Sequence, residues 1–138
     1  ILKPMDGVTP YRLEMQAKAE IEETTNLYDY WGDRLYHSVI DDSRTIINLA
    51  SKEYSKCIER YLSDKDNYIT ITFCELSGDK LVTKGTYAKM ARGEMVRFMA
   101  ENNIENPVDI KKFDRLGYIF RGDLSSETEY VFERKTIK

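Results

Sequence analysis

A change in hydrophobic period within the second half of the chain constrains the fold more than any other feature. From residue 68 to 76, apolar and polar side chains alternate as they do in a half-buried strand. Residues 77–79, Ser-Gly-Asp, can turn the chain into a second strand around residues 80–84. From residue 86 to about 102 the period becomes helical, and one apolar face of this helix should carry Tyr87, Ala88, Ala91, Met95, Phe98 and Met99. A hairpin followed by an amphipathic helix predicts an α/β fold.

Helix start and stop signals extend this pattern along the chain. Asn26 can cap a helix that runs to about Ile40. Ser51 can cap another helix, in which the spacing of Tyr54 favours packing in the core. The Asn106-Pro107 pair suits the start of a later, shorter helix that Gly117 can end.

Short alternating or β-branched runs predict the remaining strands, at residues 11–15, 45–50, 118–120 and 130–134. No repeat, linker or low-complexity tract divides the sequence, and 138 residues suit one domain. We therefore expect an α/β protein with a mixed sheet, a hairpin and about four helices, built as a single unit over residues 1–138.

Charge and cysteine usage exclude several classes of protein. The net charge of −3 argues against a general nucleic-acid coat protein, but residues 84–121 carry eight Lys or Arg against five Asp or Glu. Cys57 and Cys74 lie far apart without a CxxC motif, and His37 has no metal-spaced partner, so we expect no metal site and no cofactor. No apolar run approaches the ~20 residues of a membrane span and no secretory leader is evident, so a reducing cytoplasm fits best.

The helix expected from residue 86 raises the main functional question. Lys89, Gly93 and Arg97 fall on its polar face, with Arg92 at the border. Glycine costs about 1 kcal/mol relative to alanine in a helix, so Gly93 suggests close approach of a ligand or another backbone between cations. An anion could bind there. The alternative is that these residues form an ordinary solvated surface, which is the commoner use of such a pattern.

Two further groups of residues are weaker candidates. Arg12 and Glu14 share one face of the expected first strand. They could be a cation and an acid that line a cleft, or an exposed ion pair with only a structural role. Asn48, Ser51 and Tyr54 lie where a strand meets a helix N-terminus and could line a cleft that favours anions.

Five blocks of sequence, in this order, resemble the YaaA family of bacterial peroxide-stress-response proteins. They are PYRLEM at 10–15, YWGD at 30–33, INLASKEY at 47–54, YAKMARGEMVRF at 87–98 and GYIF at 117–120. The resemblance covers essentially the whole chain but only the C-terminal portion of the family, since the S-P-A-K-T-like motif with which members typically open is absent.

The resemblance implies a cytoplasmic protein that limits oxidative damage linked to free iron, with a family-specific α/β fold and an ability to bind DNA. No established reaction comes with it. It also implies a helix-hairpin-helix element, best placed at residues 86–102, the connector 103–106 and the helix from Pro107, although this connector has no glycine for a phosphate-binding turn. Relatives commonly read K-K-A-R-G where this chain has Met90 in the second position, so one cation is lost.

Two functions therefore stand as hypotheses. In the first, Lys89, Arg92 and Arg97, helped by Lys111, Lys112 and Arg115, contact DNA phosphates with low sequence specificity. In the second, the chain is an enzyme acting on a nucleotide or nucleobase in a cleft formed by the PYRLEM, NLAS and KMARG segments, with Glu14 as general acid or base and Arg12 beside it. Convergence of Arg12 and Glu14 with Lys89 and Arg92 in one pocket would favour the enzyme.

Incompleteness of the family match leads to a last expectation. If residues 1–138 lack the half that normally covers them, apolar surface or a strand edge near PYRLEM should be uncovered. We therefore expect self-association, most simply as a two-fold dimer.

Overall fold

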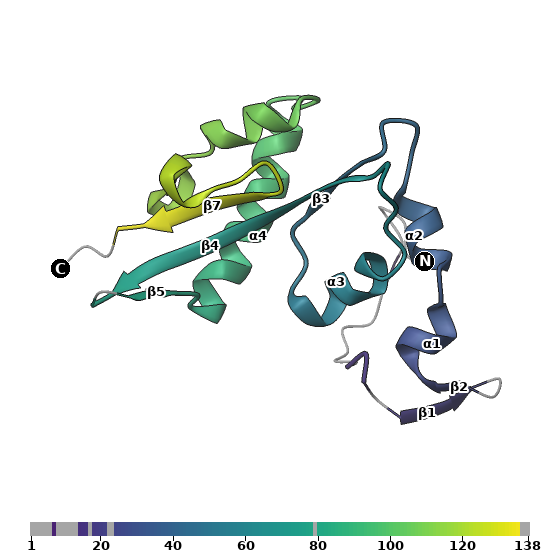
Figure 1. Cartoon of the computed structure of the whole chain (residues 1–138). Helices are drawn as coiled ribbons and strands as arrows, with labels where there is room; N and C mark the ends of the chain where they lie inside the picture. The colour runs from purple at the N-terminus through teal and green to yellow at the C-terminus, as the bar shows by residue number, and fades with distance from the viewer. Residues whose placement is uncertain (1–6, 8–13, 17, 22–23, 79, 136–138) are drawn as a thin grey trace. The chain divides into compact units, whose positions relative to one another are not determined.

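The computed structural model describes residue 7 and residues 14–16, 18–21, 24–78 and 80–135. These residues form two compact units (Figure 1). The first unit takes its residues from 1–44 and 50–66, and the second from 45–49 and 67–138. The prediction of a single domain over 1–138 stays a prediction.

The second unit contains a five-stranded mixed sheet. Its strands are β3 (Thr45–Asn48), β4 (Asn67–Ser77), β7 (Glu129–Arg134) and β6 (Tyr118–Phe120), in that spatial order, while β5 (Lys80–Val82) also pairs with β4. The pairs β3/β4 and β4/β7 are parallel, and β4/β5 and β6/β7 are antiparallel. The predicted α/β class with a mixed sheet and a hairpin is confirmed.

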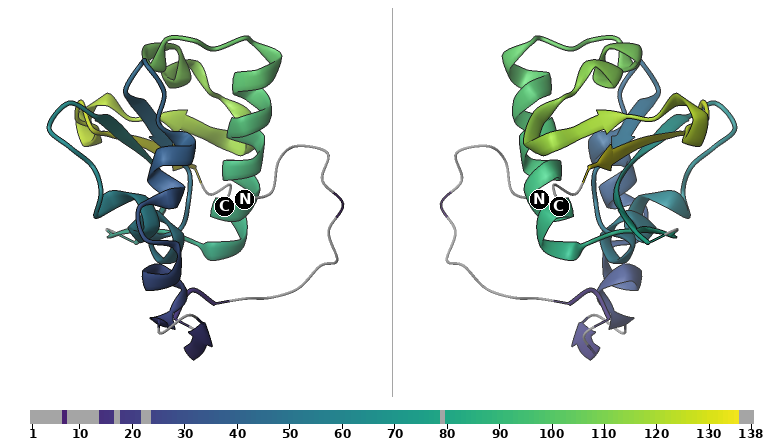
Figure 2. Two further views of the ribbon diagram at one scale, coloured as in Figure 1. Left: turned by 90° about the vertical axis from the view of Figure 1, so that its right-hand side faces the viewer. Right: turned by 90° about the vertical axis from the view of Figure 1, so that its left-hand side faces the viewer.

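Helix α4 (Gly85–Glu101) covers one face of this sheet, as both views in Figure 2 show. Its apolar stripe Ala88, Ala91, Met95 and Phe98 is buried against alternate residues of β4 and β7, as the helical period predicted. Tyr87 departs from that prediction: 42% of it is exposed, because its ring lies over the guanidinium of Arg134 instead of entering the core.

Three short 3-10 helices lie in the C-terminal half of the second unit: η1 (Pro107–Lys112), η2 (Arg115–Gly117) and η3 (Gly122–Leu124). Asn106 caps η1 by accepting a hydrogen bond from the Val108 amide, as predicted. The expected second helix of a helix-hairpin-helix is thus a six-residue 3-10 turn that ends before Phe113. Gly117 has a φ of +77° and leads the chain into β6.

The first unit is built from small elements: β1 (Lys18–Ile21), β2 (Thr24–Asn26), α1 (Leu27–Trp31), α2 (Arg34–Val39) and α3 (Lys52–Glu59). Asn26 caps α1 as predicted, since its side chain accepts from the Asp29 amide. The single helix predicted to reach Ile40 is wrong, because Gly32 adopts a φ of +51° and separates α1 from α2. Such a positive φ interrupts the helical hydrogen-bond ladder.

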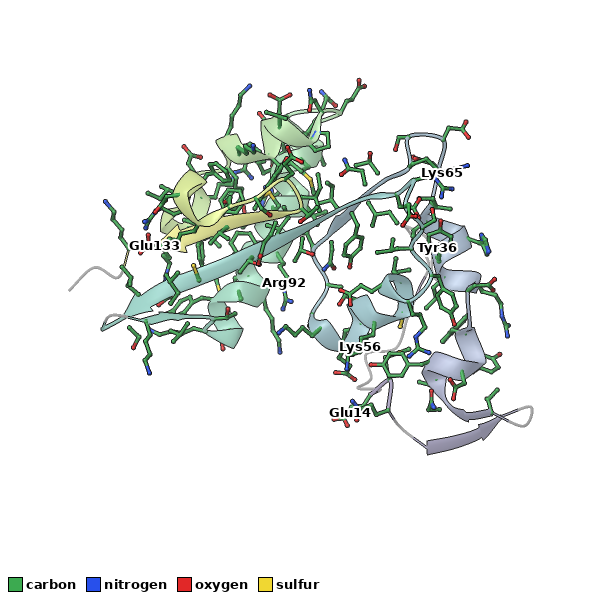
Figure 3. All side chains as sticks on the ribbon, in the orientation of Figure 1. Glu14, Tyr36, Lys56, Lys65, Arg92 and Glu133 are labelled. Carbon is green, nitrogen blue, oxygen red and sulfur yellow. The ribbon has the colours of Figure 1, made fainter. Side chains whose placement is uncertain are left out.

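A buried carboxylate ties the first unit together. The side chain of Asp66 is fully buried, and its Oδ1 lies 2.5 Å from Nη2 of Arg44. Its Oδ2 accepts hydrogen bonds from the Tyr36 hydroxyl at 2.8 Å and the Ser63 amide at 2.7 Å. The Ser63 amide does most to hold the pKa of Asp66 below its usual value, and Tyr36 and Arg44 add to the effect against the cost of burial. Tyr36 is labelled in Figure 3.

Candidate nucleic-acid interface

Two cations of α4 stand free of carboxylates. Lys89 is exposed and Arg92 is half-buried, and neither makes an ion pair or a side-chain hydrogen bond within the described part of the chain. Arg92 extends from the helix in Figure 3. No carboxylate of the described residues therefore neutralises their charges, and the binding of an anion to this face stays a prediction.

Gly93 lies in open space on the exposed side of α4. A Cβ built at this position meets no atom within 4 Å over the described residues. No other described backbone therefore approaches Gly93, and the close approach of a ligand or of another backbone stays a prediction. The helix backbone at Gly93, beside Lys89, therefore has no side chain over it.

Arg97 and Arg115 are held by acids. Glu101 accepts from Nε of Arg97 at 2.7 Å and from Nη2 of Arg115 at 2.5 Å, and Glu94 lies 3.9 Å and 3.4 Å from the same two guanidinium groups. The hydrogen bond from Arg115 has the largest effect in lowering the pKa of Glu101, and the hydrogen bond from Arg97 has the second largest. Two cations and two carboxylates cancel, so this part of the predicted basic surface is neutral.

The two predicted lysines of η1 are also engaged. Lys112 pairs with Asp109 at 2.7 Å, one helical turn away. Lys111 places its ammonium over the rings of Tyr130 and Phe120, at 4.7 Å and 5.4 Å from their centroids. Of the six predicted cations, Lys89 and Arg92 are therefore the two without a carboxylate or aromatic partner among the described residues.

The candidates near the start of the chain fall in the first unit. Arg12 lies outside the described residues, and so do Tyr11 and Leu13 of the predicted strand. Glu14 is exposed, and neither it nor Met15 belongs to a strand. The Met15 amide instead donates to Oε1 of Glu53 at 2.9 Å. Convergence of Arg12 and Glu14 with α4 stays a prediction.

The cleft-lining candidates differ from one another. Asn48, at the end of β3, is buried and donates from Nδ2 to Oγ1 of Thr70 at 3.3 Å. Ser51 occupies the cap position of α3, but its side chain makes no capping hydrogen bond. Tyr54 is 48% exposed, so the prediction that it packs in the core is wrong.

Sequence reasoning missed a charged cluster at the carboxyl ends of β4 and β7. Glu75 is fully buried, with Nζ of Lys84 3.0 Å and Nη2 of Arg134 2.8 Å from its carboxylate oxygens. Burial alone would raise the pKa of Glu75, but the contacts with Lys84 and Arg134 outweigh it and lower the pKa. The sequence alone could have indicated that Glu75 is buried, because the alternation of β4 puts Glu75 on the same face as Ile71 and Phe73.

Nowhere in the described ranges do three or more His, Cys, Asp or Glu side chains gather so as to hold a metal ion. His37 is exposed, and its Nε2 lies 3.2 Å from Oδ2 of Asp33, four residues earlier in the chain. None of the helices in the described part of the chain has both the length and the apolar character that crossing a bilayer requires.

Comparison with known proteins gives consistent matches. A family model described as "Peroxide stress protein YaaA" matches residues 1–124. The chain is 81% identical over 135 residues to a UPF0246 protein of Agathobacter rectalis, covering 98% of this chain and 54% of the relative. A UPF0246 protein of Lachnoclostridium phytofermentans is 54% identical over 132 residues, covering 96% of this chain and 52% of the relative. A UPF0246 protein of Clostridioides difficile is 42% identical over 135 residues, covering 98% of this chain and 55% of the relative. The chain spans about half the length of these curated relatives.

Proposed function

Because the chain belongs to the YaaA (UPF0246) family of peroxide stress proteins, we propose that it acts in the peroxide stress response by binding DNA through α4. In this proposal Lys89 and Arg92 contact phosphates, and the protein works in the cytoplasm to limit oxidative damage linked to free iron. The proposal rests on one observation: neither cation makes an ion pair or a side-chain hydrogen bond with a described residue.

The contrast along α4 supports this assignment. Arg97 and Arg115 already have carboxylate partners, so a phosphate would have to compete with Glu94 and Glu101 for them. Lys89 and Arg92 carry no such competitor within the described ranges, so binding a phosphate there breaks no existing ion pair. The exposed surface at Gly93 leaves room for a strand of DNA to lie against the helix.

Low sequence specificity follows from placing Lys89 and Arg92 on phosphates and not on base edges. The helix reads GTYAKMARGEMVRFMAE and contains no Asn or Gln, the residues that pair bidentately with adenine in the major groove. Lysine and arginine contacts to phosphates position a protein on DNA without reading its sequence.

We infer the link to iron from the same electrostatics. DNA holds a condensed layer of cations, and a protein that neutralises phosphates releases them. Ferrous iron associated with the backbone would be released with the other counterions, away from the sugars that it damages under peroxide. The proposal therefore needs no iron ligands on the protein itself.

The test is the salt dependence of DNA binding, measured by fluorescence anisotropy on a labelled duplex. The double variant Lys89→Gln/Arg92→Gln should bind more weakly and lower the slope of log affinity against log salt by about two, since each lost phosphate contact removes about 0.9. Lys112→Gln is the matched control, because it removes one positive charge that is already paired with Asp109. Equal losses in the double variant and the control, or no DNA binding by the parent chain, would refute the proposal.

A further inference from the structure

The Glu75 cluster is a second charged site, and it is built differently from the α4 surface. Glu75 and Arg134 are direct partners across the parallel pair β4/β7, and Val82 of β5 faces Glu75 from the other side. Lys84 follows β5 and occupies the cap position of α4. Three elements thus bring one carboxylate and two cations to the carboxyl end of the parallel strands. Ligands of open α/β sheets bind at that end.

The cluster is not satisfied by the described residues. The Glu75 oxygens each lie within 3.0 Å of a cationic nitrogen, but the buried Nε of Arg134 has no acceptor among the described residues. Burying charge in this way costs more than an apolar residue of similar volume would at the same core position. A buried N–H without an acceptor adds a further cost of about 1–3 kcal/mol.

The charges of the cluster do not cancel. Glu75 supplies one negative charge, whereas Lys84 and Arg134 supply two positive charges. The cations also reach solvent and the carboxylate does not: the Lys84 side chain is 48% exposed and that of Arg134 is 20% exposed. An anion arriving from solvent therefore contacts the two cations and does not contact Glu75.

The first turn of α4 adds positive potential beside them. It contains no acidic residue, and the cap position makes no side-chain hydrogen bond, so no side chain caps its first amides. Gly85 has open space where a Cβ would stand. The Tyr87 ring, in the same turn, lies 3.6 Å from the Arg134 guanidinium carbon and fixes that group against the helix.

We propose that Lys84, Arg134 and the first-turn amides of α4 form a binding site for a phosphate monoester, with Glu75 as a positioning residue that holds the two cations side by side. The charge fits: a monoester carries about −1.5 to −2 at pH 7, against a net of one positive charge from the side chains and about +0.5 from the helix terminus. A phosphodiester, with one negative charge, matches this site less well. The inference goes beyond the proposed function, because it concerns other residues and another class of phosphate.

Isothermal titration of the whole chain with inorganic phosphate tests the site. Lys84→Gln should weaken phosphate binding at least about tenfold, because it removes a charge-assisted contact. Lys80→Gln is the matched control, since Lys80 is an exposed lysine of the adjacent strand β5. It should change the affinity less than about twofold. No phosphate binding by the parent chain, or equal loss in both variants, would overturn the proposal.

Further titrations identify the source of the phosphate and separate this site from the DNA surface. A nucleoside 5′-monophosphate and a 5′-phosphorylated oligonucleotide should each bind in a Lys84-dependent way, whereas a 5′-hydroxyl oligonucleotide should not. The Lys89→Gln/Arg92→Gln variant should keep its affinity for inorganic phosphate, so the two proposals fail independently. If the 5′-hydroxyl oligonucleotide depends on Lys84 as strongly as the phosphorylated one, the site binds phosphodiesters and the monoester assignment is wrong.

Discussion

The two compact units differ in what holds their interiors together. In the second unit Phe73, Phe113 and Phe132 meet pairwise, with ring centroids 5.6 to 5.9 Å apart. In the first unit, over its described residues, the apolar cluster has three buried members, Met15, Leu27 and Cys57, and the buried Asp66 carboxylate links Tyr36, Arg44 and Ser63. The second interior should therefore respond mainly to lost volume, and the first mainly to a change of charge.

The largest expected effect is on the aromatic interior. Phe132→Ala should lower the free energy of unfolding by about 3–5 kcal/mol, since a fully buried ring is removed from a packed cluster. Leu27→Ala in the first unit should cost less, because fewer buried apolar neighbours surround Leu27 in the described structure. Chemical denaturation of both variants measures the difference, and an equal or larger loss for Leu27→Ala would break the comparison between the units.

The charge dependence of the first unit can be tested through Asp66. Asp66→Asn should destabilise the protein at neutral pH, because the buried Arg44 contact loses its anion. The folded-state pKa of Asp66 is lowered, so its contribution is present above the unfolded pKa and is lost as the pH falls through the folded value.

The thermal midpoints of the parent and Asp66→Asn should therefore converge as the pH falls below about 4. Asp64→Asn is a suitable control, because the Asp64 side chain is exposed and makes no ion pair or hydrogen bond with a described residue. A gap between parent and Asp66→Asn that is constant from pH 7 to pH 3 would show that Asp66 acts through shape instead of charge.

The same contrast explains what could be predicted from the sequence. The strand, hairpin and long helix of the second unit follow from local periodicity, and the apolar face predicted for α4 includes its four buried residues but also the exposed Tyr87. The first unit was predicted less well, because a single glycine at position 32 decides where α1 ends. Its role depends on a positive φ that the surrounding helical spacing does not reveal.

Side-chain partners from distant segments were not predictable. Whether Arg115 is free or paired depends on how η2 lies against α4, which brings it to Glu94 and Glu101. Glu75 meets Arg134 only through the register of β4 and β7. Local patterns identify which faces carry charge, but strand register and helix packing decide which charges stay unpaired.

Two glycines, one in each unit, sharpen the comparison. Gly32→Ala should destabilise the first unit by about 1–3 kcal/mol, because φ is +51° there and an L side chain is strained in that region. Gly93→Ala should stabilise the second unit by about 0.5–1 kcal/mol, since the new methyl group meets open space in a regular helix. Urea denaturation distinguishes the two signs, and destabilisation by Gly93→Ala would show that the helix is not regular at that point.

The smallest expected effect on stability is that of Glu101→Gln, at the surface of the second unit. Glu101 is exposed, and exposed ion pairs contribute little to folding, so the denaturation midpoint should hardly move.

Glu101→Gln should strengthen DNA binding, whereas most substitutions at a binding surface weaken it. Without this carboxylate, Arg97 and Arg115 lose their closest anionic partner and become available to phosphates. The slope of log affinity against log salt should then rise by about one for each cation that engages the DNA. Glu105→Gln controls for the change in net charge, because Glu105 is exposed and makes no ion pair with a described residue. If both variants strengthen binding equally, the gain reflects net charge alone, and the distinction between paired and unpaired cations on α4 does not govern binding.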